Sequence, residues 1–174
     1  MLKKLIVITF SFLLYFNSSI SNDLKIVYVD IDKVINQSNA GKTITKQLEI
    51  INNSNLKKFK KIKEKLSEDE TNIIKQKNIL SKEEFDIKVK TLQKNIKNFK
   101  KDVNISRENL NKKKIEGTTQ ILTILNKILS EYSSKNSISL IIQKKNIVIG
   151  MTELDITTQI LKIVNTKIKS VKLN

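Results

Sequence analysis

Apolar residues in the middle of the chain recur at alternating intervals of four and three, the spacing that places them on one face of a helix in a coiled coil. Ten such positions run from Leu48 to Leu80, and six of them are apolar. Eight more run from Phe85 to Leu110, and seven of those are apolar. The pattern predicts two long helices, each with one apolar seam, that pack against each other.

The two seams meet at a sequence typical of a helix start. Ser81 and Glu84 have the spacing of a capping box, in which each side chain satisfies a backbone N–H group at the helix start. Leu80 and Phe85 occupy the positions of the accompanying hydrophobic staple. One uninterrupted helix is the alternative, but cap and staple together favour a hairpin. The predicted helices run from about Lys42 to Asn78 and from about Lys82 to Ser134.

The end of the second helix carries more apolar residues than a two-helix seam needs, so that end should enter a globular core. Gly117 marks the transition, and it is compatible with either a packing contact or a slight kink. The apolar positions that follow it are Ile121, Leu122, Ile124, Leu125, Ile128 and Leu129.

Short apolar and β-branched runs near both ends of the chain predict strands. Neither set forms a stable sheet alone, so strands from the two ends must meet. Two of the runs flank Lys144 and Lys145 and are interpreted as a tight hairpin, although lysine is not ideal in its turn. A closing helix follows, with Asp155 as its cap. The predicted elements are strands at residues 25–30, 138–143 and 146–151 and a helix at residues 156–168.

These elements define an α+β fold in which a small β-body carries a long antiparallel coiled-coil hairpin, the arm. At about 1.5 Å per residue, the arm should reach on the order of 55 Å. A body of roughly 60 residues buries little surface and exposes strand edges, so we predict a homo-oligomer that associates through the body. The predicted division is a signal peptide at 1–21, a body formed by 22–41 with 135–174, and an arm at 42–134 whose tip lies near 79–82.

The first residues have the features of a cleavable signal peptide. Lys3 and Lys4 provide a positive start, and residues 5–16 form an uncharged apolar run. That run is shorter than the about 20 residues that span a membrane comfortably. Small residues precede Asn22, before which we predict cleavage. An uncleaved membrane anchor is the alternative, and secretion is the expectation.

The net charge of the chain limits the classes of molecule that it is expected to bind. The chain of 174 residues carries a formal charge of +16, which becomes +14 once Lys3 and Lys4 are removed. Residues 42–135 alone hold 23 Lys and Arg against 12 Asp and Glu. Such a charge favours nucleic acid, an anionic membrane or acidic protein partners. Arg107 is the sole arginine, and arginine is the usual reader of base edges, so we expect no nucleic acid partner.

The composition leaves little room for catalysis. The chain contains no histidine and no cysteine, which excludes an ordinary catalytic triad, a cysteine nucleophile and a standard zinc site. It has three glycines and no phosphate-binding loop. We therefore expect no enzyme activity, no catalytic or metal-binding residues and no cofactor.

Loose motifs mark the two ends of the mature chain. At the start stand residues 25–38 (KIVYVDIDKVINQS), then Ala40-Gly41-Lys42 and Leu48. At the close stand 138–142 (ISLII), 147–149 (IVI), Asp155-Ile156-Thr157 and Ile160-Leu161. Together with the helical middle and the tip at 80–84 (LSKEE), these motifs resemble the Skp/OmpH family of periplasmic chaperones.

The resemblance implies a periplasmic homotrimer, in which three hairpins extend like tentacles from a shared β-body around a cavity. Such proteins hold unfolded outer-membrane β-barrel proteins in transit and prevent their aggregation without ATP. Basic arms would attract acidic clients at long range, and phenylalanines at the seam edge would hold client segments weakly at many points.

Candidate contact residues follow from charge and seam position. For clients, they are Lys57, Lys58, Phe59, Lys60, Lys61, Phe85, Lys97, Phe99, Lys100, Lys101, Lys112, Lys113 and Lys114. For oligomerisation through the body, they are Ile26, Tyr28, Leu140, Ile142, Ile147 and Ile149.

Two other classes of function are considered. An envelope coiled-coil spacer would lay its lysines against anionic lipid or lipopolysaccharide. A nucleic-acid-binding coiled coil is less favoured, because it would require a cytosolic location. Client aggregation, vesicle binding and cellular location distinguish the three.

Overall fold

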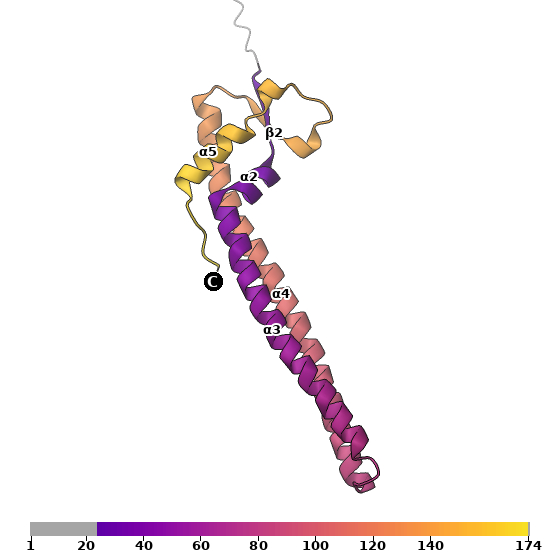
Figure 1. Cartoon of the computed structure of the whole chain (residues 1–174). Helices are drawn as coiled ribbons and strands as arrows, with labels where there is room; N and C mark the ends of the chain where they lie inside the picture. The colour runs from indigo at the N-terminus through magenta and orange to yellow at the C-terminus, as the bar shows by residue number, and fades with distance from the viewer. Residues whose placement is uncertain (1–23, 174) are drawn as a thin grey trace, which may run out of the picture.

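The computed structural model describes residues 24–173 and consists of a small body from which one long arm projects (Figure 1). The arm is a hairpin of α3 (Asn39–Lys75) and α4 (Lys82–Lys135), so the predicted fold class is confirmed. The predicted signal peptide at residues 1–21 lies outside the described residues. The body contains strands β1 (Ile26–Val29) and β2 (Leu140–Gln143), helices α2 (Ile31–Gln37) and α5 (Thr157–Lys167), and the 3-10 turns η2 (Lys144–Asn146) and η3 (Thr152–Leu154).

Serine caps begin both arm helices. The Ser38 side chain accepts a hydrogen bond from the Gly41 N–H at 3.1 Å and starts α3. The predicted capping box starts α4. Ser81 Oγ accepts from the Glu84 N–H at 3.3 Å, and Glu84 Oε2 accepts from the Ser81 N–H at 3.1 Å. Each bond satisfies a donor that has no partner within its helix.

The tip of the arm differs slightly from its prediction. α3 ends at Lys75 rather than Asn78, because the next residues fold into a tight turn in which the Leu80 N–H donates to the Gln76 carbonyl at 3.0 Å. α4 agrees with the predicted helix to within one residue at each end.

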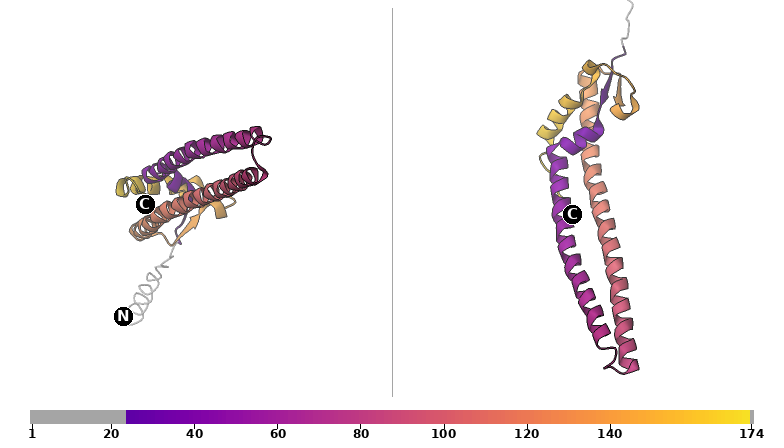
Figure 2. Two further views of the ribbon diagram at one scale, coloured as in Figure 1. Left: turned by 90° about the horizontal axis from the view of Figure 1, so that it is seen from below. Right: turned by 45° about the vertical axis from the view of Figure 1, so that its right-hand side comes forward.

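The two helices pack along the predicted seam over the length of the arm (Figure 2). Apart from Asn52, every position of the two predicted seams is partly buried. Phe59 and Phe99 meet edge to face, with ring centroids 6.0 Å apart and planes at 78°. Such a pair contributes about 0.5–1.5 kcal/mol beyond the area it buries. Two helices alone leave the sides of a seam open, so no seam position of the arm is fully buried.

The hydrophobic core lies where the arm joins the body. Ile121, Leu125 and Ile128 of α4 are fully buried, as their crowding in the sequence predicts. Segments from both ends of the chain pack against them, so one core joins the N-terminal segment, the base of the hairpin and the C-terminal segment. The residues that contribute from the two ends include Val29, Val34, Ile160 and Val164.

Gly117 is a packing contact. A Cβ atom at this position would lie 2.8 Å from Ile44 Cδ1 and 2.8 Å from Leu173 Cδ2, so glycine allows α3 and the C-terminal segment to approach α4 closely. Gln47 of α3 holds the same segment. Its side-chain amide donates to the Val171 carbonyl at 2.7 Å and accepts from the Leu173 N–H at 3.1 Å. The C-terminal segment therefore binds across the base of the hairpin.

Strands from the two ends of the chain meet, as predicted. β1 pairs with β2 in a parallel sheet of two strands, with Ile26 opposite Leu140 and Val29 opposite Gln143. The whole arm lies between them in the sequence, so the arm is the crossover that a parallel pair requires.

The predicted tight hairpin of residues 138–143 and 146–151 is wrong. β2 leads into the 3-10 turn η2, and residues 147–151 form no strand. Lysine does not favour the positive φ that a two-residue hairpin turn needs. The chain returns to β1 instead. The Tyr28 hydroxyl donates to the Met151 carbonyl at 3.1 Å, and the Ile156 N–H donates to the Tyr28 carbonyl at 2.9 Å.

The closing helix forms as predicted, but its N-cap is Ile156, one residue after the predicted cap Asp155, and Ile156 makes no side-chain cap hydrogen bond. Helix α5 begins at Thr157, and the Asp155 carboxylate accepts hydrogen bonds from both the N–H and the hydroxyl of Thr157. The Thr157 Oγ1 atom in turn accepts from the Asp30 N–H at 2.9 Å. These bonds connect the start of α5 to the end of β1.

Replacing Ile121 by alanine should lower the free energy of unfolding by about 2–5 kcal/mol, because the core closes incompletely around the cavity left behind. Ile115, on the same helix with 57% of its surface exposed, is the matched control. The Ile115→Ala change should cost less than about 0.5 kcal/mol. Urea denaturation followed by circular dichroism measures both. Equal effects at the two positions would contradict a core at the base of the arm.

Candidate functional site

The basic candidate residues form an exposed field along the arm. All of them lie on α3 or α4, and all are solvent-exposed except Lys113, which is partly buried. Lys60 lies 3.9 Å from Glu64, one turn further along α3. The lysines on α3 are Lys57, Lys58, Lys60 and Lys61, and those on α4 are Lys97, Lys100, Lys101, Lys112, Lys113 and Lys114. Because they are spread along two helices, their charges sum to a positive potential over much of the arm.

The aromatic candidates lie in the seam. Phe59 and Phe99 fill it together near the middle of the arm, and Phe85 lies in the first turn of α4, next to the tip. All three are partly buried. They stabilise the arm and present only part of their surface to a partner.

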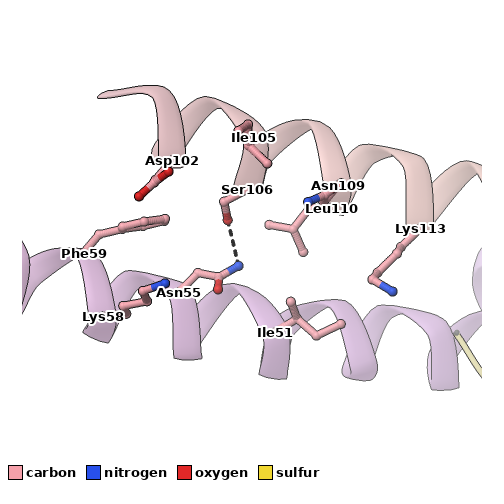
Figure 3. A pocket seen from close by; sticks show the side chains of 10 residues that line it. All are labelled: Ile51, Asn55, Lys58, Phe59, Asp102, Ile105, Ser106, Asn109, Leu110 and Lys113. Carbon is pink, nitrogen blue, oxygen red and sulfur yellow. Dashed lines mark hydrogen bonds between the residues drawn. The ribbon is translucent and has the colours of Figure 1, made fainter. Parts of the chain in front are cut away.

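A hollow of about 400 Å³ opens beside the seam, partway along the arm (Figure 3). Across it, Asn55 Nδ2 donates to Ser106 Oγ at 2.8 Å. These two small polar side chains occupy seam positions where apolar side chains would otherwise fill the space. Ile51, Phe59 and Leu110 line the hollow beside them, so its surface is mixed. The polar residues within the seam indicated from the sequence that the seam is imperfect. The sequence did not show that Asn55 faces Ser106, because this depends on the register of the two helices.

An apolar surface is exposed on the body. Val148 and Ile149 leave 98% and 92% of their surface accessible, and they lie in the segment between η2 and η3. Met151 of the same segment is also exposed, as are Leu140 of β2 and Ile26 of β1. We name these five residues the body patch.

The structure divides the candidate oligomerisation residues. Ile26, Leu140 and Ile149 are exposed, Ile142 and Ile147 are partly buried, and Tyr28 is buried within the body. Val148 was not among the predicted residues, because the alternation of a strand would place it on the face opposite Ile147 and Ile149. Met151 was not singled out either, although it would have shared their face. The signal available in the sequence was the run of apolar residues itself.

A small polar network holds the segment that carries Val148 and Ile149. Lys144 Nζ lies 2.8 Å from Asp155 Oδ2 and 5.6 Å from the centre of the Tyr28 ring. The pKa of Lys144 is raised by its hydrogen bond and its attraction to Asp155. Burial raises the pKa of Asp155, but hydrogen bonds from Lys144 and Thr157 outweigh it, so the net pKa lies below the ordinary value. The network fixes both ends of residues 144–155.

The described residues offer no metal-binding cluster of acidic side chains. No helix within residues 24–173 has both the length and the apolar character needed to cross a bilayer.

The arrangement defines a class of protein: a small α+β body that carries a long, basic helical hairpin. The model of the OmpH-like outer membrane protein family matches residues 25–164, and the chain belongs to this family. A Caulobacter crescentus crystal structure, described as a candidate OmpH-like outer membrane chaperone, shares the fold with a TM-score of 0.80. Identity is 13%, and the match covers 92% of this chain and 95% of that one. No curated protein matches the chain.

The family resemblance recognised in the sequence is thereby confirmed, since residues 25–164 include the helical middle and the motifs on either side of it. The client contacts and the oligomerisation residues stay predictions.

Acid should weaken the body through Asp155. Because the pKa of this carboxyl is lowered in the folded protein, its ionised form stabilises the fold at neutral pH. That stabilisation should be lost as pH falls through the ordinary value of 3.8 toward the lower folded pKa. The Asp155→Asn variant should therefore be less stable than the wild type at neutral pH and lose less stability in acid.

Urea denaturation at a series of pH values tests this expectation. Asp86→Asn, at an exposed position on the arm, is the control and should keep the acid response of the wild type. If Asp155→Asn and Asp86→Asn showed the same acid response, the network would have no part in acid sensitivity.

Proposed function

We propose that this protein is a periplasmic holding chaperone that binds unfolded outer-membrane β-barrel proteins among its arms and prevents their aggregation without ATP. Membership of the OmpH-like family carries the proposal. The chaperone description of the structural neighbour, which has the same fold, supports it. In this proposal the protein is not an enzyme and needs no cofactor.

The basic arm accounts for capture. An arm with an excess of lysine attracts acidic chains from a distance and raises the rate of encounter. Short-range contacts of the phenylalanine edges then retain client segments at several points. Each contact is weak, and simultaneous contacts raise the overall affinity without a rigid pocket.

Assembly through the body completes the proposed chaperone. A parallel sheet with two strands is marginal alone, and parallel sheets are almost always covered on both faces. The body patch lies next to this sheet, because Ile26 and Leu140 are part of it. Other copies of the chain would cover the patch and extend the sheet. That three copies assemble is an inference from the family resemblance. Three basic arms would repel each other and keep the cavity between them open.

Salt should weaken client capture. Attraction between exposed charges is screened over about 8 Å at physiological ionic strength and over shorter distances at higher salt. We expect suppression of aggregation of an unfolded β-barrel protein, measured by light scattering, to decrease as sodium chloride is added. Capture that is insensitive to salt would contradict the electrostatic part. Vesicle binding without an effect on aggregation would instead favour the envelope spacer, with lipid or lipopolysaccharide as partner.

Placing a charge on the body patch should dissociate the oligomer. In the mature protein, Ile149→Asp would bury an unpaired carboxylate at the proposed interface, which is strongly unfavourable. Ile79→Asp is the matched control, because Ile79 is 81% exposed at the tip of the arm. The mass in solution, from light scattering, should fall to that of a monomer for Ile149→Asp and stay that of the wild type for Ile79→Asp. A monomeric wild type would refute assembly.

A further inference from the structure

The hollow of Figure 3 is one part of a longer groove. A second hollow, further toward the tip, shares Asp102 with the first, and a third shares Asp69 and Asn95 with the second. The lining extends from Ile51 of α3 to Gln76, the residue after its last turn, which corresponds to roughly 38 Å of helix. These three connected hollows, here named the arm groove, run along one side of the seam.

Carboxamide side chains border the arm groove along much of its length. Asn72, Asn95, Asn98 and Asn109 line it from both helices. All four are solvent-exposed, and none makes a side-chain hydrogen bond within the described part of the chain. Each amide offers two donors and one acceptor. An extended polypeptide presents one N–H and one carbonyl per residue, so such a border can bind a main chain of any sequence.

The charges that border the groove favour an acidic occupant. Lysines line it at four positions and aspartates at two, so the groove is positive overall. The aspartates, Asp69 and Asp102, lie toward the middle of its length, and Lys88 lies toward the tip. A cationic border attracts chain segments with carboxylate side chains.

Apolar side chains at the groove supply the third kind of contact. Ile105 is 42% exposed where it lines the first hollow, and Ile87 is 64% exposed where it lines the third. A pair of helices leaves the side of its seam uncovered, so a third segment laid along the groove would remove this apolar surface from water.

We propose that the arm groove binds an extended, acidic segment of unfolded polypeptide along the axis of a single arm. The asparagines bind its main chain, the lysines attract its carboxylates, and Ile87 and Ile105 contact its apolar side chains. The inference rests on the proposed chaperone function and deepens it. It places the short-range client contacts between the two helices of one arm, while the lysine field attracts clients from a distance.

Site-specific crosslinking tests the position, because the wild-type chain contains no cysteine. In the mature protein, Ile105→Cys would carry a photoactivatable label in the groove. Ile115→Cys would carry the same label on the same helix at an exposed isoleucine that lines none of the three hollows. With an unfolded β-barrel protein as client, the crosslinking yield should be several-fold higher at residue 105.

Equal crosslinking yields at the two positions, with aggregation still suppressed, would contradict client binding in the arm groove but not the proposed chaperone function. An absence of aggregation suppression in the unlabelled wild type would instead refute the proposed function itself. Circular dichroism of each labelled protein verifies that the arm is intact.

Neutralising the net positive charge of the groove lining gives a second, independent measurement. The double variant Asn98→Asp/Asn109→Asp adds two carboxylates to the border and should weaken client affinity about threefold to tenfold, as exposed charge contacts typically do. Asn104→Asp/Asn53→Asp adds the same charge on exposed arm positions outside the three hollows. Equal weakening by both variants, from fluorescence titration, would show that only net charge matters and would overturn the groove.

Discussion

The body depends on one hydrophobic cluster at the base of α4, where segments from the two ends of the chain pack against the same buried side chains. Ile121, Leu125 and Ile128 supply the central surface of this cluster. Two strands and two short helices could not form an independent core, because a sheet of that size needs a packed partner. The arm is stabilised differently, because its seam residues are only half-buried and its helix caps bond to residues close by in the sequence. Stability is therefore concentrated at the base, and the arm is free to open locally at lower cost.

The features predicted from the sequence are those encoded by short spacings. The seam follows from intervals of three and four residues. The start of α4 follows from the capping box of Ser81 and Glu84 together with the staple positions of Leu80 and Phe85. The crowding of apolar residues after Gly117 located the core for the same reason, because more than one face of a helix can be apolar only where the helix is surrounded.

The features that the sequence did not predict depend on contacts between distant residues. Residues 147–151 have the composition of a strand, but the bond from Tyr28 to Met151 and the ion pair of Lys144 with Asp155 hold this stretch in another conformation. The arm groove could not be predicted either. Its first hollow opens where Asn55 faces Ser106, and their facing depends on the length of the turn at the tip and on the packing of both helices.

The two hydrogen bonds that join Gln47 to Val171 and Leu173 affect the order in which the arm and the body fold. Both arm helices and the turn between them lie within residues 39–135, so their seam can pack while the C-terminal segment is still being made. The base of the hairpin cannot close until the segment with Val171 and Leu173 has been made, because Leu173 packs at Gly117 and Gln47 binds both residues. In a chain that is still being synthesised, the arm can therefore fold before the body does. A label attached at the tip of the arm therefore lies far from the segment that closes the base.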